Sequence, residues 1–241
     1  MPDLKIALWN CSGLRSSAAF TAHKMGFFDK EFPDAHFGLA IFVETHHRGE
    51  DDFPELIKEY KHTHHILHTP TPPHHTHSGV IVLLRKDFEI ISTTIKIPGR
   101  LLNVKFKDKI ENKNYNLSAF YGPIIKTILK KDLNTLVQNF YDVHRKCDNN
   151  IIIGDFNFID NNFDKNNGMD SHDKKISSIW EDFKQKVNVV DPFRDHYPTT
   201  NFFSYVTSNA RSQLDRIYVT GDHVICVRDN IFIIPILIPI S

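Results

Sequence analysis

Short runs of β-branched and aromatic residues, separated by turn-forming residues, recur along most of the chain. Such runs are typical of strands that are at least half buried in a sheet. The pattern predicts strands at Leu4–Trp9, Phe37–Val43, Gly79–Leu84, Phe88–Ile97, Leu101–Phe106, Tyr115–Tyr121, Asn150–Ile153, Phe202–Val206, Leu214–Val219 and Val224–Val227.

Two segments instead show the three- and four-residue spacing of an amphipathic helix. They contain Leu133, Leu136, Val137, Phe140, Tyr141 and His144 in the first, and Ile176, Ile179, Trp180, Phe183 and Val187 in the second. A shorter helix is predicted over Phe53–Tyr60. Many strands with few helices favour two sheets packed on each other, with helices outside. Without an internal repeat or a linker-like break, residues 1–241 are expected to form one domain.

The composition is that of an ordinary globular protein, with 41% hydrophobic and 24% charged residues among 241. Lys and Arg number 29, as do Asp and Glu, so the formal net charge is zero. That balance argues against a protein that coats nucleic acid, but it allows an enzyme that contacts a phosphodiester briefly. The three cysteines are far apart, and neither a signal peptide nor a membrane-length apolar run is visible. A soluble, intracellular protein without a membrane segment is expected.

Several common catalytic motifs are missing from the sequence. There is no Gly-x-Gly, no Gly-x-x-x-x-Gly-Lys phosphate loop, no His-Glu-x-x-His and no Gly-x-Ser-x-Gly. Their absence argues against the common kinds of nucleotide-cofactor enzyme, ATPase, zinc protease and serine hydrolase.

Polar residues stand at the predicted ends of several strands, namely Asn10, Glu44, Tyr121, Asp155, Asn157 and Asp215. Ligands commonly gather beyond one end of the strands of an open sheet, so these residues indicate one site built from distant segments. Asp155 and Asn157 are two residues apart, which places both side chains on one face of an extended chain. Oxygen ligands of this kind suit Mg²⁺ or Mn²⁺. Taken singly, each residue is more often a turn former or a helix cap.

The same segments resemble the motifs of the endonuclease/exonuclease/phosphatase superfamily, which includes exonuclease III and the abasic-site endonucleases. The endonuclease domain of non-LTR retrotransposons is the most similar member. The motifs follow in family order and cover nearly the whole chain: Trp-Asn-Cys-Ser-Gly-Leu-Arg at 9–15, Glu-Thr-His at 44–46, His-Ser-Gly-Val-Ile-Val-Leu-Leu at 77–84, Tyr-Gly-Pro at 121–123, Gly-Asp-Phe-Asn at 154–157, Asp-Pro-Phe-Arg at 191–194, Phe-Phe-Ser-Tyr at 202–205 and Ser-Gln-Leu-Asp-Arg-Ile at 212–217.

The resemblance implies an α/β fold, a four-layer α/β/β/α sandwich of two packed mixed sheets of the DNase I-like kind. It also implies roles for the polar residues. Glu44 would be the main ligand of Mg²⁺ (or Mn²⁺), with Asn10 nearby. Asp155 would orient and deprotonate the attacking water, while Asn157 and Tyr121 would steady the phosphate and its developing charge.

Further roles are implied around the last motif. Asp215 would hold a catalytic histidine in the required tautomer, as the carboxylate of a triad does. Ser204 and Ser212 would lie near the phosphate. Arg211 and Arg216 are candidates for phosphate contact, although Arg216 could equally be a surface partner of an acidic side chain.

The sequence departs from the family at its closing Ser-Asp-His motif. We expect Ser241 to be the serine of that motif, with the Asp-His beyond the chain given. Asp222-His223 falls in a predicted hairpin turn and is not expected to substitute. Loss of such a charge-stabilising group lowers hydrolase rates by orders of magnitude, so residues 1–241 alone are expected to nick weakly or not at all. Smaller departures are Ser12, on the metal side, and Ile124, which bears on DNA contacts.

The expected function is Mg²⁺-dependent nicking of DNA by an endonuclease of the retrotransposon or abasic-site type. DNA is the expected partner, a reverse transcriptase region is expected in a longer chain, and DNA as substrate implies a nuclear location. Two alternatives stay open. One is a catalytically silent, truncated relic of the domain, and the other is a phosphatase or phosphodiesterase of the same superfamily acting on a small or lipid substrate.

Two segments have a biased composition. His62–His77 holds seven of the fifteen histidines together with three prolines, which predicts a solvated loop with at most adventitious Zn²⁺ or Ni²⁺ binding. Asp160–Asp173 is rich in Asn and Asp, which predicts a mobile loop. Lysines 126, 130 and 131 could touch DNA phosphates, but a solvated helix face is the simpler explanation.

Overall fold

The structure is a computed structural model that describes residues 5–14, 30, 37–123, 130–208, 210–220, 231–234 and 236–237. Several sequence predictions lie outside these residues. They concern the strand at 224–227 and residues 124, 126, 222, 223 and 241.

The described residues form strands, four α-helices and three short 3₁₀ turns. The strands are β1 (Ile6–Asn10), β2 (Leu39–Val43), β3 (His64–Thr69), β4 (Val80–Arg85), β5 (Phe88–Ile97), β6 (Leu101–Asp108), β7 (Lys113–Tyr121), β8 (Asn150–Asp155), β9 (Val189–Val190), β10 (Tyr205–Val206), β11 (Arg211–Ser212), β12 (Asp215–Thr220), β13 (Ile231–Ile234) and β14 (Ile236–Leu237). The helices are α2 (Glu55–Glu59), α3 (Lys130–His144), α4 (Ser171–Val187) and α5 (Pro192–His196), and the 3₁₀ turns are Glu50–Asp52, Tyr60–His62 and Asn162–Asp164. No helix in the described ranges is both long and apolar enough to cross a membrane.

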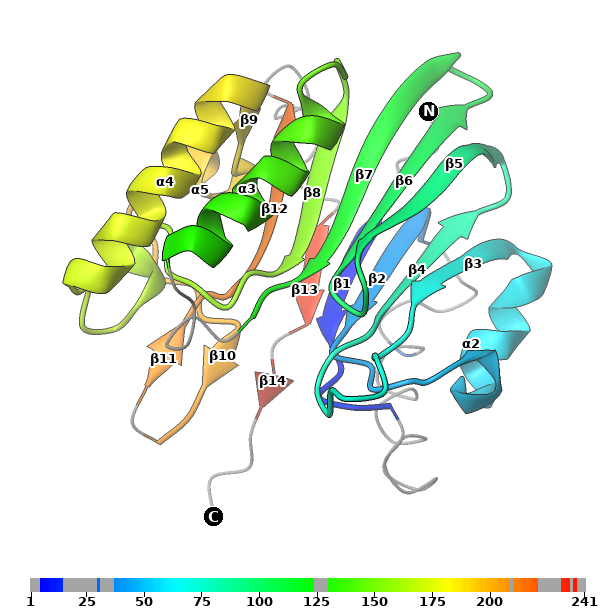
Figure 1. The fold of residues 1–241 in the computed structure, drawn as a ribbon, viewed down its shortest axis with the longest axis horizontal. Coiled ribbons are helices and arrows are strands. Elements are labelled where there is room, and N and C mark those ends of the chain that lie inside the picture. Colours follow the sequence, from blue (N-terminus) through cyan, green and yellow to red (C-terminus); the bar gives the residue numbers. More distant parts are fainter. Residues whose placement is uncertain are drawn as a thin grey trace.

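Two large mixed sheets dominate the fold (Figure 1). The first has the strand order β13-β1-β2-β4-β3, and the second has the order β5-β6-β7-β8-β12-β9. In the first sheet β1 runs parallel to β13 and β2, and in the second β7 runs parallel to β8, whereas the other neighbours are antiparallel. A small sheet of order β11-β10-β14 lies beside one end of the large sheets.

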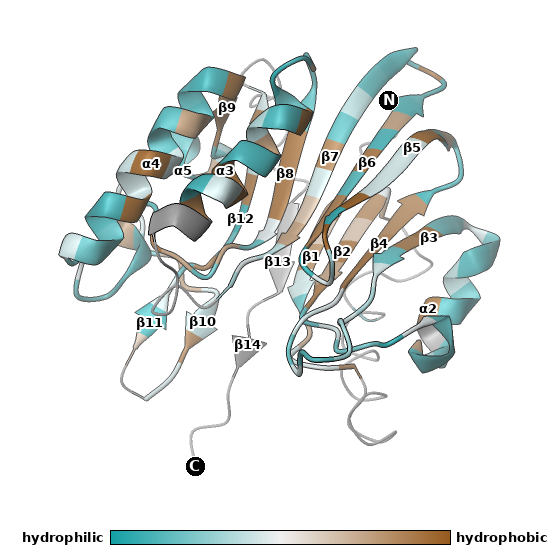
Figure 2. Ribbon diagram, viewed as in Figure 1, coloured by the Kyte–Doolittle hydropathy of each residue, from teal (hydrophilic) through white to brown (hydrophobic). Residues whose placement is uncertain are grey.

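Three apolar clusters define the layers. The first fills the space between the sheets and joins Leu8 of the first sheet to Ile153 of the second. The next packs Ile57 of α2 on the outer face of the first sheet. The third packs Phe140 of α3 and Trp180 of α4 on the outer face of the second. Brown, hydrophobic colour dominates β4 and β8 in Figure 2 and alternates with teal along α4, as this layering requires. The predicted four-layer α/β/β/α sandwich is confirmed.

Most predicted elements are present, with shifted ends. The strand at Phe88–Ile97 and the two long helices are confirmed. Helix α4 begins earlier than its apolar period because the Asp170 side chain accepts hydrogen bonds from the backbone N–H groups of His172 and Asp173. The predicted strand at Phe202–Val206 is largely wrong, since only Tyr205–Val206 is paired.

The prediction of a solvated histidine loop over residues 62–77 is wrong for its first half. Residues 64–69 form β3, the edge strand of the first sheet, which pairs with β4. His64 is buried, and its ring lies 4.6 Å from that of Phe37, measured between centroids. A neutral imidazole can occupy a strand position that faces apolar side chains, so a tract rich in histidine does not have to be solvated.

Gly154 allows the close approach of β7 and β8 beside Asp155. A Cβ atom at this position would lie 1.7 Å from the backbone carbonyl oxygen of Phe120, so the two strands would have to separate. We expect Gly154→Ala to lower the free energy of unfolding by about 1–3 kcal/mol, as other overpacked cores do. Urea denaturation measures the change. Gly49→Ala is the control, because a Cβ there meets nothing within 4 Å, and equal midpoints for both variants would contradict the expectation.

Candidate active site

The polar strand-end residues of the second sheet lie on the face that packs against the first sheet. Side chains alternate between the two faces of a strand, and Ala119, Ile153 and Ile217 all belong to the cluster between the sheets. Tyr121 and Asp155 lie two residues beyond the first two of these, so they continue the same inward-facing rows.

Backbone pairing brings these rows to one edge of the sheet. Tyr121 is the pairing partner of Asp155 between β7 and β8, and Asp155 is the partner of Asp215 between β8 and β12. All three residues are at most 4% exposed. Three polar groups from strands far apart in the sequence therefore share one buried corner, as the sequence predicts.

Asn10 connects this corner to the first sheet. It follows Leu8 by two residues, and its Nδ2 atom donates a hydrogen bond of 2.7 Å to Oδ2 of Asp155. Glu44 stands directly after β2, and the side chains of Asn10 and Tyr121 act on it as hydrogen-bond donors that lower its pKa. Asn10, Glu44, Tyr121 and Asp155 therefore form one connected group across the two sheets.

Asn157 takes part in this group through a turn. Strand β8 ends at Asp155, and Asn157 has a left-handed backbone with φ of 53°. Its backbone N–H donates to Oδ1 of Asp155 at 2.8 Å, and its Nδ2 donates to the carbonyl oxygen of Gly122 at 2.8 Å. A turn, and not the extended chain that the sequence argument assumed, sets the position of Asn157 relative to Asp155.

Ser204 supports the loop that leads into Asp215. Its Oγ atom accepts hydrogen bonds from the backbone N–H groups of Leu214 and Asp215 at 3.0 and 3.1 Å. Oδ1 of Asp215 is buried and has no hydrogen-bond partner among the described residues. Asp215 therefore keeps one oxygen free for a partner from elsewhere.

The electrostatics of the corner follow from burying several carboxyl groups together. Burial and the nearby charge of Glu44 together raise the pKa of Asp155 to about 6, against the lowering effect of hydrogen bonds from the Asn157 backbone and Asn10. Burial and the Asp155 carboxylate raise the pKa of Asp215 well above its ordinary value. Burial would also raise the pKa of Glu44, but hydrogen bonds from His46, Asn10 and Tyr121 lower it overall.

These shifts fit the binding of a cation. The charge of Glu44 raises the proton affinity of Asp155 and Asp215, and the charge of Asp155 raises that of Asp215 as well, which is the condition that a bound divalent ion relieves. The oxygens of Glu44 and Asn10 are of the hard type that Mg²⁺ and Mn²⁺ prefer. The residues present therefore fit the metal that the sequence predicts.

The remaining predicted residues lie on or next to the small sheet. Ser212 pairs with Tyr205, and Arg211 is exposed on the same short strand, β11. The backbone N–H of Arg211 donates to Oδ1 of Asn166 at 3.4 Å, so this contact leaves its guanidinium available. A contact between Arg211 or Ser212 and phosphate stays a prediction.

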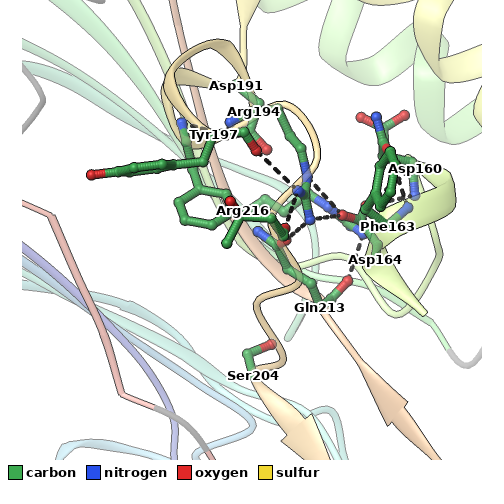
Figure 3. Close-up of polar contacts among 12 residues, drawn as sticks. Asp160, Phe163, Asp164, Asp191, Arg194, Tyr197, Ser204, Gln213 and Arg216 are labelled. Atoms are coloured by element: carbon green, nitrogen blue, oxygen red, sulfur yellow. Dashed lines mark hydrogen bonds and ion pairs between the residues drawn. The ribbon is translucent and has the colours of Figure 1, made fainter. Parts of the chain in front are cut away.

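The interpretation of Arg216 as a phosphate contact is wrong, and the alternative holds only in part, because Arg216 is the partner of an acidic side chain but lies in the interior and not at the surface. Arg216 is 1% exposed, and its guanidinium donates to Oδ2 of Asp164 at 2.8 Å and to the carbonyl oxygen of Phe158 at 2.9 Å. Arg194 binds the other Asp164 oxygen, so two guanidinium groups converge on one carboxylate (Figure 3). Because strand neighbours point to opposite faces, Asp215 faces the site and Arg216 faces away. The same contacts anchor the 160–173 segment that the sequence predicts to be a mobile loop.

Two residues that the sequence left unassigned lie next to Glu44. His46 Nε2 is 3.5 Å from Glu44 Oε1, and His77 Nδ1 is 4.0 Å from the same oxygen. Both histidines stand inside motifs that the sequence singles out, Glu-Thr-His and His-Ser-Gly. The proximity of the two histidines could have been predicted from the pairing of β2 with β4, which places the two motifs side by side.

Comparisons with known proteins agree with this architecture. Residues 7–231 match the Endonuclease/Exonuclease/phosphatase family. An alignment of 160 positions with the transposon TX1 uncharacterized 149 kDa protein of Xenopus laevis is 30% identical and takes in 61% of this chain. The match spans only 11% of that relative's length.

Solved structures show the same fold at low sequence identity. The AP endonuclease LMAP from Leishmania major superposes with a TM-score of 0.71 at 14% identity, over 92% of this chain and 80% of that one. The 3' phosphatase NExo from Neisseria, bound to a product DNA hairpin, superposes with a TM-score of 0.66 at 14% identity, over 92% and 88% of the two chains. The DNase I-like sandwich that the sequence predicts is thereby confirmed.

Proposed function

The chain belongs to the endonuclease/exonuclease/phosphatase family, and on that premise we propose that it nicks DNA by metal-dependent hydrolysis of a phosphodiester bond. The observation that carries the proposal is the buried corner in which Asp155 is held by Asn10 and by the backbone N–H of Asn157. Tyr121 and Asp215 flank Asp155 on the neighbouring strands.

Each side chain of the corner has a role in this proposal. Asp155 accepts the proton of the attacking water, and the two hydrogen bonds to its oxygens fix the direction in which it does so. Burial and the nearby carboxylates raise the pKa of Tyr121 above its ordinary value, so the phenol stays protonated and can donate to phosphate. The amide of Asn157, positioned by the carbonyl of Gly122, is a second donor.

The metal side of the corner consists of Glu44 and Asn10. These residues would hold Mg²⁺ or Mn²⁺, which when bound polarises a phosphoryl oxygen and favours the formation of the nucleophile from water. The pKa of Glu44 is lowered, so its carboxylate is ionised at neutral pH and can act as a metal ligand. Asp215, with its free Oδ1, would orient a histidine or another proton donor.

DNA is the proposed substrate because two independent comparisons favour it. The sequence relative is named as a transposon protein, and a solved structure of the same fold is named in complex with product DNA. We also propose that the nick opens target DNA for a mobile element, with a reverse transcriptase region in a longer chain and action in the nucleus. A phosphatase or lipid phosphodiesterase, or a silent relic, is the alternative.

A plasmid assay separates these functions. Supercoiled plasmid is incubated with the protein in molar excess, with Mg²⁺ or Mn²⁺ and with EDTA as the control, because the sequence predicts slow turnover for residues 1–241. Nicked circles that require the metal are expected. Phosphate release from small phosphoesters is measured in parallel. Release without nicking would support the phosphatase alternative, and no reaction in either assay would support the relic.

A further inference from the structure

We infer that His46, His77 and Glu44 form a binding site for a first-row transition-metal ion such as Zn²⁺. Among the described residues, these three offer ligand atoms that all lie within 4.8 Å of one another. The site shares Glu44 with the proposed Mg²⁺ site, but its other two ligands are histidines, which that site does not use. It does not depend on the nuclease function proposed above.

The distances between the ligand atoms match tetrahedral coordination. Zinc bonds of about 2.0–2.2 Å place two ligand atoms of a tetrahedron about 3.3–3.6 Å apart. His77 Nδ1 lies 3.3 Å from His46 Nε2, and His46 Nε2 lies 3.5 Å from Glu44 Oε1. The third separation, from His77 Nδ1 to Glu44 Oε1, is 4.0 Å and needs only a small movement of an exposed side chain.

The backbone explains why the two histidines meet. Val43 at the end of β2 pairs with Val80 at the start of β4, so the segment after β2 and the segment before β4 begin side by side. The backbone N–H of His46 donates to the carbonyl oxygen of Ser78 at 2.8 Å, which joins the two segments and brings His46 beside His77. On the other side of the His46 ring, a Cβ added to Gly13 would come within 2.7 Å of Nδ1, so the ring is confined.

The ligand chemistry selects the class of ion. Two imidazole nitrogens and one carboxylate are a ligand set found in zinc enzymes, whereas Mg²⁺ prefers oxygen. The side chains of Glu44 and His46 are 18% and 21% exposed, but that of His77 is 66% exposed. One side of the group is therefore open to solvent, which leaves room for water as a fourth ligand. Without a metal, the same atoms form an imidazole–imidazole hydrogen bond beside a carboxylate.

Metal titration of the 241-residue chain shows whether these three residues bind a metal ion or only form the hydrogen bond between the two imidazoles. After removal of metal with a chelator, Zn²⁺ binding is measured by calorimetry and Co²⁺ binding by its visible absorption, which is much stronger for four-coordinate than for six-coordinate Co²⁺. We expect one Zn²⁺ per chain and a Co²⁺ spectrum of the four-coordinate type. His77→Gln should weaken Zn²⁺ binding by at least about 10-fold, a loss that even an outer-shell partner can cause.

His74→Gln is the matched control, because His74 is exposed in the same tract but is outside the group. We expect it to leave Zn²⁺ affinity unchanged, and we expect His77→Gln to leave Mg²⁺ binding unchanged. Equal Zn²⁺ affinity in the wild type and His77→Gln, or an equal loss in both variants, would overturn the site. No DNA is present, so a chain that binds Zn²⁺ as expected and fails to nick plasmid would refute the proposed function alone.

Discussion

Replacing Asp155 with asparagine is expected to lower the rate of metal-dependent plasmid nicking by about 10²–10⁴-fold, the contribution typical of a general base. Asparagine keeps the shape of the side chain but cannot accept the proton of water. Its amide nitrogen would also face one of the two donors that the carboxylate now binds, Nδ2 of Asn10 or the backbone N–H of Asn157. The rate is measured in a single turnover, with protein in excess over supercoiled DNA.

The control for this variant is Asp148→Asn, since Asp148 is exposed after α3 and outside the site. It should nick at the wild-type rate. Thermal unfolding of both variants shows whether either change acts through stability. Undiminished nicking by a folded Asp155→Asn chain would falsify the assignment of Asp155 as the base.

The largest loss of stability is expected from Asp164→Asn. Asp164 is fully buried and binds both Arg194 and Arg216. Arg216 is itself 1% exposed, so removing the negative charge leaves a buried cation without its main counter-ion. Breaking a buried ion pair in this way costs about 3–5 kcal/mol, so the urea midpoint should fall strongly.

An exposed ion pair supplies the comparison for Asp164. Asp87 lies 2.6 Å from Arg85, but its side chain is 39% exposed. Solvent screens such pairs, and Asp87→Asn should change the free energy of unfolding by less than about 1 kcal/mol. Similar midpoints for the two variants would mean that Asp164 is not the centre of a stabilising network. The network matters for the site because Arg216 and Asp215 are neighbours in β12.

Much of the candidate site could be predicted because its residues continue, at the strand ends, the rows of side chains that face the other sheet. Asn10 continues the row of Leu8, and Tyr121 continues the row of Ala119. This alternation is a local property of the chain and can be read from adjacent residues. The same rule, applied to Arg216 beside Asp215, would have placed it on the opposite face.

Other features were beyond the sequence because they depend on contacts between distant segments. The partner of Arg216 is Asp164, 52 residues earlier. The Asp160–Asp173 segment has the composition of a mobile loop, yet these long-range ion pairs anchor it. Histidine is not an apolar residue, so the histidines of β3 do not mark it as a strand in the sequence. Residues 64–69 nevertheless form an edge strand, because they pair with β4.

The alternation within the strands, the two amphipathic helices and the polar residues at the ends of the inward-facing rows all follow from the amino-acid sequence. These depend on the order of neighbouring residues, which the chain carries before it folds. Which rows meet depends on the folded arrangement of the two sheets, and so do the hydrogen bond from Asn10 to Asp155 and the contact between His46 and His77. The physical reason is that strand register and sheet packing join segments far apart in the sequence. Their pairing follows from burial of the whole apolar surface, and no single segment specifies it.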